Sequence, residues 1–240
     1  FQWDVVQRQT VTLSLVEPGP ARALADFRHM PGVVWAEPFR MVPVELRAGP
    51  ITRRIPLQGL PAQGTLSRVI DGTPQQLMLP ARGIIMSAKL AEVLQLRPGD
   101  EVVARVLEGR EREIAVPIVG LAEDFAGTAA YMELHALNRL LLEGDRISGA
   151  HVVVDKERWT EFLDAVKNTP RLAGCVIKDS LREGFRKTTA ESIGLLQKIY
   201  MLFATIVAFG IIYNSARISL SERARELATL RVLGFTRGEV

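Results

Sequence analysis

Apolar residues are spread unevenly along the chain, and one stretch differs from the rest. Residues 199–216, IYMLFATIVAFGIIYNSA, contain no charged side chain. A helix of that length is about 27 Å long, close to the roughly 30 Å thickness of a bilayer's hydrocarbon core. Lys198 and Arg217 flank the stretch, where their long side chains can extend to the interfaces. A buried helix of a soluble core is the alternative, but eighteen uncharged residues is long for one. We therefore predict a transmembrane helix.

Residues within this stretch have separate expected roles. Tyr200 and Tyr213 lie near its ends, where amphipathic rings favour the headgroup level. Ala204 and Ala208 are four residues apart, a spacing that lets another helix approach closely. The transmembrane residues that we single out are Ile199, Tyr200, Ala204, Ala208, Tyr213 and Ala216.

Short apolar runs separated by turn residues fill the part of the chain before Asp179. Strand–helix–strand patterns occur at both ends of this part, and Pro and Gly residues lie between their runs. The first pattern comprises residues 11–16, 21–30 and 33–46, which precede a further strand at 51–60, and the second comprises residues 151–155, 159–168 and 175–178. We expect Pro18-Gly19-Pro20 to close the first strand, and Pro38 and Pro43 to break the third run. The fold class predicted is α+β, with a split βαβ sheet domain made of residues 1–60 and 150–179.

The segment between these two strand–helix–strand patterns has a different distribution of apolar and polar residues. A short apolar strand at 83–87 leads into a helix at 88–96, and valines and isoleucines then alternate with polar residues on both sides of Glu108-Gly109. This alternation predicts a hairpin of residues 101–107 and 112–119, and a helix at 133–142 follows. We interpret residues 61–149 as a small β-rich subdomain inserted into the sheet domain.

Composition and charge narrow the function classes. The chain is 48% hydrophobic, which excludes a wholly disordered protein, and its 30 Lys+Arg are dispersed among 27 Asp+Glu. Without a basic stripe, nucleic acid is not an expected partner. Four basic residues lie within twenty positions on each side of the apolar stretch, so the positive-inside rule does not orient it.

The sequence also lacks the common catalytic motifs. It has no phosphate-binding P-loop, no GxGxxG and no GxSxG. Cys175 is the single cysteine, and His29, His135 and His151 are scattered singly. Glu123-Asp124 form an acidic pair with no identifiable partner, typical of a solvated turn. We therefore predict no enzymatic activity, and no catalytic, cofactor or metal site in this chain.

The segment after the apolar stretch has an amphipathic pattern. Ser219 and Glu222 have capping-box spacing, and leucines recur at helical intervals up to Gly234, which fits the position after a helix end. We expect a short amphipathic helix at 219–234, separated from a stalk and transmembrane helix at 180–218. The start of a next helix is expected at 235–240.

These residues resemble a known family. Ser221-Glu222-Arg223, Arg225-Glu226-Leu227 and the run from Leu230 to Gly234 are similar to the S-E-R-x-R-E-[IL]-x-x-L-R-x-L-G segment of FtsX-like (MacB-type) ABC transporter permeases. The stretch from Gly83 to Asp100 is similar, more loosely, to a G-[IV]-[IV]-x-S-x-x-L-A-x-x-L-x-L-x-x-G-D pattern of the same family.

The resemblance implies an arrangement across the membrane and a set of partners. Residues 1–198 would be extracytoplasmic and residues 217–240 cytoplasmic, in a bacterial inner membrane. ATP would be bound by a separate ABC-type ATPase subunit, which explains the missing P-loop. Further expected partners are a second permease copy or paralogue, membrane lipids and an extracytoplasmic partner protein. The coupling helix would contact the ATPase through Glu222, Arg223, Arg225, Glu226, Leu227, Leu230, Arg231, Leu233 and Gly234.

The sequence is compatible with three functions. The leading one is a permease subunit that couples ATP hydrolysis to export or extraction of an amphipathic substrate, such as a lipid, lipoprotein or peptide. The second is an FtsX-like transmembrane transmitter that regulates a cell-wall hydrolase. The third is a single-span receptor that binds a ligand outside. The permease interpretation requires further apolar segments, so we expect the chain to be a piece of a longer protein.

Overall fold

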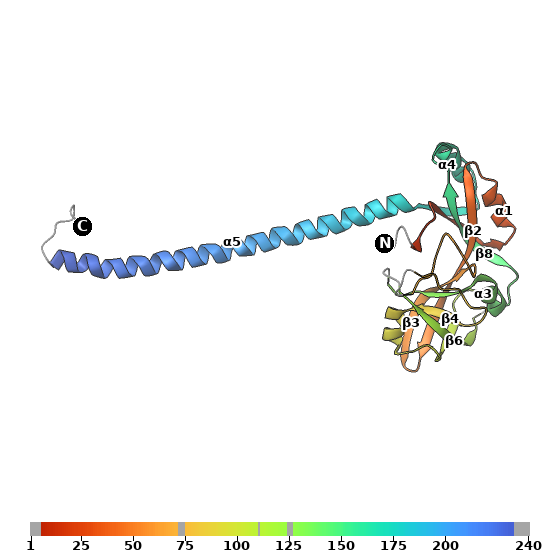
Figure 1. Cartoon of the computed structure of the whole chain (residues 1–240), viewed down its shortest axis with the longest axis horizontal. Coiled ribbons are helices and arrows are strands. Elements are labelled where there is room, and N and C mark those ends of the chain that lie inside the picture. Colours follow the sequence, from red (N-terminus) through yellow and green to blue (C-terminus); the bar gives the residue numbers. More distant parts are fainter. Residues whose placement is uncertain (1–5, 72–74, 110, 124–126, 233–240) are drawn as a thin grey trace. The chain divides into compact units, whose positions relative to one another are not determined.

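The computed structural model describes residues 6–71, 75–109, 111–123 and 127–232 of the chain. These residues form two compact units, Phe1–Arg182 and Glu183–Val240, which are described separately. The first unit is a mixed α+β domain with a nine-stranded sheet, and the second consists of one long helix (Figure 1). The predicted α+β sheet domain followed by a long apolar helix is therefore confirmed.

Four strands of the first unit form an open antiparallel sheet in the order β2-β8-β1-β9. Each crossover helix joins two strands that lie on either side of a third, which is the predicted split βαβ arrangement. The elements are β1 (Val11–Pro20), α1 (Ala23–Arg28), β2 (Val33–Ala48), β8 (Arg146–Val154), α4 (Trp159–Lys167) and β9 (Leu172–Ile177).

Strict alternation gives this open sheet two unlike faces. Val11 and Leu13 of β1 are fully buried in one core with Phe27 of α1 and Phe162 of α4. Their neighbours along β1 are the polar residues Thr12 and Ser14, and successive side chains of a strand point to opposite faces. One face is therefore covered by α1 and α4, and the other presents polar side chains.

The remaining strands close into a ring with part of β2. Strand β2 pairs with β3 and β5, β3 with β7, β7 with β4, β4 with β6, and β6 with β5, so the six strands form a barrel. Hydrophobic residues from alternate positions, such as Val42, Val44 and Leu46, fill its core. The elements are β3 (Ile51–Leu60), β4 (Ile84–Ser87), α2 (Ala88–Leu94), β5 (Glu101–Val106), β6 (Glu113–Ala122), β7 (Ala130–Glu133) and α3 (Leu134–Leu141).

Strand β2 belongs to both the open sheet and the barrel. Its first half, Val33–Phe39, pairs with β8, and its second half, Val44–Arg47, pairs with β5. Residues 42–57 were assigned from the sequence to the split domain, but their buried side chains consequently pack in the same core as the predicted insert. The hairpin of β5 and β6 forms as predicted.

Two prolines that we expected to break β2 do not break it. Pro38 lies opposite Ala150 of β8 and Pro43 opposite Pro56 of β3. Both prolines are close to Arg40, where β2 stops pairing with β8 and starts pairing with β3 and β5. A proline has no backbone N–H to donate, and a strand tolerates this loss where its hydrogen-bonding partner changes. Strand β1 likewise continues to Pro20, with an irregular register beyond Ser14.

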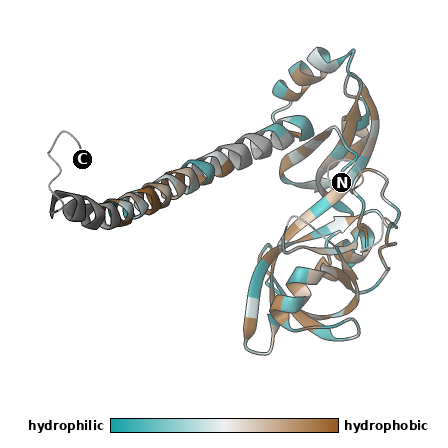
Figure 2. Ribbon diagram, turned by 60° about the vertical axis from the view of Figure 1, so that its left-hand side comes forward, coloured by the Kyte–Doolittle hydropathy of each residue, from teal (hydrophilic) through white to brown (hydrophobic). Residues whose placement is uncertain are grey.

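Helix α5 (Lys178–Val232) is one uninterrupted helix of 55 residues. It begins directly after β9, and its most apolar part is Leu196–Ser221, long and apolar enough to cross a membrane (Figure 2). The expected break before Ser219 is absent, because the chain has neither Gly nor Pro between Ile211 and Val232. The segment 219–232 is thus a continuation of the same helix.

Candidate functional site

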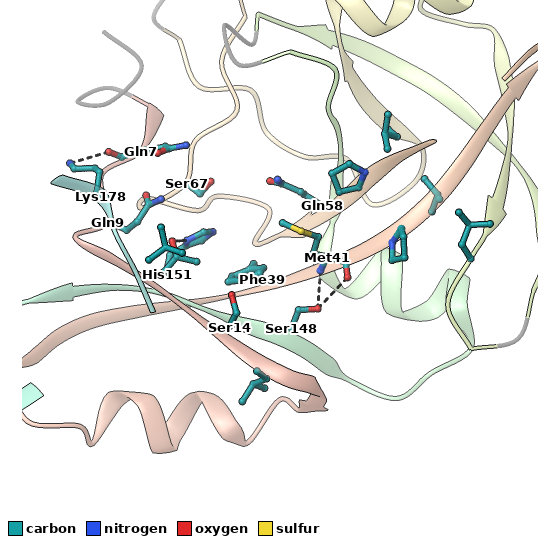
Figure 3. Close-up of a pocket in the computed structure, with 18 of the residues that line it drawn as sticks. Gln7, Gln9, Ser14, Phe39, Met41, Gln58, Ser67, Ser148, His151 and Lys178 are labelled. Carbon is teal, nitrogen blue, oxygen red and sulfur yellow. Dashed lines mark hydrogen bonds between the residues drawn. The ribbon is translucent and has the colours of Figure 1, made fainter. Parts of the chain in front are cut away.

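A cavity of about 830 Å³ opens on the helix-free face of the open sheet (Figure 3). The open sheet, the adjoining part of β2, strand β3, the N-terminal segment and the 61–70 loop all contribute to its walls. The lining residues are Gln7, Gln9, Thr12, Ser14, Leu15, Phe39, Met41, Pro43, Val44, Arg54, Ile55, Pro56, Gln58, Ser67, Leu107, Ser148, His151, Val176 and Lys178.

His151 of β8 forms part of the floor of this cavity. Its ring stacks on Phe39, with ring centroids 4.7 Å apart and an angle of 26° between the rings. Its Nδ1 lies 3.1 Å from the Thr12 hydroxyl, and the two residues are opposite each other in the β1–β8 register. Burial lowers the pKa of His151 to about 4, although the charge of Glu37 opposes this shift. The imidazole is therefore neutral at pH 7.

Gln9 is a polar side chain that is almost completely buried against the cavity. It is 5% exposed, and its Oε1 accepts no hydrogen bond from any group in the part of the chain that the structure describes. A buried acceptor without a donor costs about 1–3 kcal/mol, so such an atom is unusual in a folded protein. Nearby, Lys178 Nζ donates to the Gln7 carbonyl oxygen over 3.3 Å.

The charged side chains among the described lining residues are of one sign, although one of them is paired with a carboxylate outside the lining. Among the described lining residues there is no carboxylate, and the two charged side chains are Arg54 and Lys178. Arg54 Nε donates to Glu45 Oε2 over 2.8 Å at the exposed edge of the barrel. This hydrogen bond lowers the pKa of Glu45. The cavity thus combines apolar surface, uncharged hydrogen-bonding groups and positive charge.

Glu37 fixes the loop that covers one side of the cavity. Its carboxylate is 8% exposed and accepts hydrogen bonds from the Thr65 hydroxyl at 2.6 Å, the Thr65 and Leu66 backbone N–H groups and Trp35 Nε1. Burial alone would raise the pKa of Glu37, but these hydrogen bonds outweigh it and the pKa is lowered. The ionised carboxylate therefore holds the loop that contains Ser67.

Arg40 ties the barrel to the open sheet where β2 changes partners. Its side chain is 1% exposed and donates to Ser148 Oγ at 3.0 Å, Glu108 Oε1 at 3.1 Å and Glu143 Oε2 at 3.2 Å. Ser148 Oγ in turn contacts the Met41 backbone, accepting from its N–H at 3.0 Å. Glu108 was expected only as a turn residue, so its role here was missed.

The six predicted transmembrane residues all lie in α5, within Leu196–Ser221. The structure also lengthens the apolar span at both ends relative to the predicted 199–216. Each of the six side chains is exposed: Ile199, Tyr200, Ala204, Ala208, Tyr213 and Ala216. Helix α5 thus carries its apolar side chains outward, as expected of a helix whose surroundings are lipid or other helices.

The predicted coupling residues continue along the same helix. The backbone from Glu222 to Arg231 is helical, whereas Leu233 and Gly234 lie outside the described residues. The cavity was not predicted from the sequence. Its signal was the alternation of Thr12 and Ser14 with Val11 and Leu13, a pattern that any half-buried strand also shows.

Comparison with known proteins first defines a class. The chain is similar in fold to the periplasmic region of MacB from Actinobacillus actinomycetemcomitans, with a TM-score of 0.50 and 11% identity over 76% of this chain and 95% of that one. The extracellular domain of the noncanonic ABC-type transporter YknZ from Gram-positive bacteria also matches, with a TM-score of 0.46 and 14% identity over 70% of this chain and 98% of that one. No curated protein matches the chain in sequence. The first likeness defines an α+β fold of the MacB periplasmic type.

The C-terminal part resembles a permease family in sequence. Residues 198–240 match the family model of the FtsX-like permease C-terminal region. The predicted resemblance to FtsX-like (MacB-type) permeases is therefore confirmed, by sequence in this segment and by fold in the sheet domain. The sequence match of this segment and the fold of the sheet domain support the predicted inner-membrane location with the folded domain outside the cytoplasm. Permeases of this family are transporter components that work with ABC ATPases.

Proposed function

We propose that this chain is part of a permease subunit that couples ATP hydrolysis by a separate ATPase to movement of its extracytoplasmic domain. The observation that carries the proposal is the continuity of α5. The helix begins at Lys178, directly after edge strand β9, and reaches Val232 inside the segment that matches FtsX-like permeases. One secondary-structure element thus joins the sheet domain to the coupling segment.

The lengths of the parts of α5 suit this role. At about 1.5 Å per residue, the apolar part Leu196–Ser221 measures about 39 Å, enough to span a bilayer with some tilt. The part before it extends about 27 Å, and the part after it about 16 Å. A helix without Pro or a break keeps its backbone hydrogen bonds throughout and therefore transmits displacement along its axis.

The coupling surface lies in the last turns of α5. Leu227 and Leu230 would bury against the ATPase, and Arg223, Arg225, Glu226 and Arg231 would provide charge complementarity. ATP would bind to that partner. A second permease copy or paralogue would contact the small residues Ala204 and Ala208, which are exposed on α5. The substrate would be an amphipathic molecule exported or extracted at the outer face.

The test is ATPase coupling in lipid nanodiscs that hold the full protein with its ATPase. We expect Leu227→Asp and Arg225→Glu each to abolish assembly with the ATPase or its stimulation, because an apolar contact or a charge pair is lost at the interface. Leu142→Asp and Arg53→Glu are matched controls on exposed positions of the sheet domain. Leu142 has φ 53°, a conformation that Asp tolerates. Unchanged coupling in both coupling-helix variants would contradict the proposal.

A further inference from the structure

The cavity on the open sheet has the size and composition of a ligand site. Its volume of about 830 Å³ lies within the roughly 300–1,000 Å³ typical of small-ligand pockets. Its walls mix apolar and uncharged polar side chains, so that Phe39 and Met41 lie among Gln9, Ser14 and Gln58 (Figure 3). We infer that the cavity binds a short apolar peptide segment that is neutral or anionic.

The mixture of lining groups favours a peptide over an acyl chain. A peptide presents an amide group at every residue and apolar side chains between them, which matches walls that offer both kinds of contact. An acyl chain has no group to pair with the hydroxyls of Ser14 and Ser67 or with the amide of Gln58, and would leave them desolvated. The uncharged polar groups therefore favour an amide-bearing ligand over an acyl chain.

The Gln9 side chain specifies one hydrogen bond in this site. Its Oε1 is buried and accepts no hydrogen bond within the described residues, although buried polar atoms normally have partners. The atom lacks a donor among these residues and is shielded from solvent where it stands, so a backbone N–H of a bound peptide would pair with it once the Gln9 side chain turns into the cavity that it lines. Gln7 and Lys178 lie beside it at the same end of the cavity (Figure 3).

The charges of the described lining residues disfavour a basic ligand. Arg54 and Lys178 line the cavity, and the described lining residues include no carboxylate that could pair with a cationic peptide. An anionic C-terminus is compatible with this surface, whereas lysine or arginine side chains would be buried without a counter-charge. The inference rests on the proposed function in one respect: such a peptide would be the amphipathic substrate, or part of it.

The experiment measures binding by isothermal titration calorimetry to the full chain in lipid nanodiscs, without ATP or ATPase. The probes are N-acetyl-Ala-Leu-Val-Ala with a free carboxylate, N-acetyl-Ala-Lys-Val-Lys-amide, and decanoate. We expect saturable binding of the first probe and none of the other two. Saturable binding of decanoate in place of the apolar peptide, or of the basic peptide with equal affinity, overturns the proposal.

Two variants locate the binding. Gln9→Leu keeps the size of the side chain but removes the acceptor, and we expect it to weaken binding of the apolar peptide about tenfold or more. Gln63→Leu is the control, because Gln63 is exposed and does not line the cavity. Ser14→Asp adds a carboxylate to the floor and should shift preference toward the basic peptide. Binding that neither Gln9→Leu nor Ser14→Asp changes would overturn the proposal.

Failure of the peptide-binding inference can be distinguished from failure of the proposed ATPase coupling. Leu227→Asp should bind the apolar peptide like the unmodified chain, because residue 227 lies in the C-terminal unit and the cavity lies in the first. Loss of peptide binding in Gln9→Leu with ATPase assembly intact supports the site independently of the coupling helix.

Discussion

The barrel and the open sheet share strand β2, yet they use it differently. In the barrel the strands close a ring of pairings around a core of alternating apolar residues. In the open sheet one face packs against α1 and α4, while the other lines the cavity and carries His151, Thr12 and Ser14. A closed barrel leaves no free edge, whereas the half-covered sheet leaves one face open to the cavity.

The largest effect that tests this difference is expected at Gly149 in β8. Gly149 lies between Ser14 of β1 and Phe39 of β2, and a Cβ there would collide with the Leu13 carbonyl oxygen and lie 3.0 Å from the Phe39 ring. Because a backbone carbonyl in a sheet cannot move aside cheaply, we expect Gly149→Ala to lower the free energy of unfolding by at least about 3 kcal/mol. Urea unfolding in nanodiscs, followed by tryptophan fluorescence, measures this.

Gly174 supplies the matched control for Gly149. It also pairs with Ser14, from the other neighbouring strand, but a Cβ at Gly174 meets no atom within 4 Å. We expect Gly174→Ala to change the free energy of unfolding by less than about 1 kcal/mol. Equal losses in the two variants would contradict the view that the open sheet depends on close approach of β1 to β8.

A smaller loss is expected where the barrel meets the open sheet. Arg40→Met keeps apolar volume but removes the donor shared by Ser148, Glu108 and Glu143. Both carboxylates are about a third exposed, 31% and 28%, so water can solvate them partly after the loss. We expect a decrease of about 2–3 kcal/mol in the free energy of unfolding, below that of breaking a fully buried pair.

Arg47→Met is the control for this joint. Arg47 pairs with Glu113 on the barrel surface, and both side chains are 52% exposed. An exposed ion pair contributes less than about 1 kcal/mol, so the variant should unfold almost like the original chain. If Arg40→Met were equally mild, the buried arginine would not hold the two parts together.

The local sequence pattern was sufficient to predict individual helices and strands, but not to predict which strands pair with one another. The alternation around Glu108-Gly109 predicted the β5–β6 hairpin, and the uncharged stretch predicted the membrane helix, because both depend on neighbours in sequence. The barrel was not predicted. Its closure depends on β2 pairing with both β3 and β5, and residues 42–60 give no local sign of that double role.

The cavity was unpredictable for a related reason. His151, Thr12 and Gln9 are distant in sequence from Ile55 and Gln58, and only the change of partners along β2 brings them around one space. His151 is a lone histidine in a strand, which sequence reasoning assigns to packing. The resemblance to the permease family concerned the coupling segment and the 83–100 stretch, and neither contributes a residue to the cavity lining that the structure describes.

The smallest effect expected concerns the pH dependence of the open sheet, through His151. Its pKa is about 4 in the fold against about 6.5 in the unfolded chain, so between these values the unfolded state binds more protons. The stability that His151 contributes is complete above pH 6.5 and is lost as pH falls toward 4. The full pKa shift corresponds to about 3 kcal/mol of unfolding free energy, and partial exposure of the ring to the cavity reduces this contribution to about 1–2 kcal/mol.

His151→Gln keeps a hydrogen-bonding group for Thr12 without titrating, so its urea-unfolding free energy should fall less between pH 7 and pH 4.5 than that of the original chain. Parallel pH profiles for the two chains would show that the cavity face does not hold His151 in its neutral form, and would remove this contrast with the barrel.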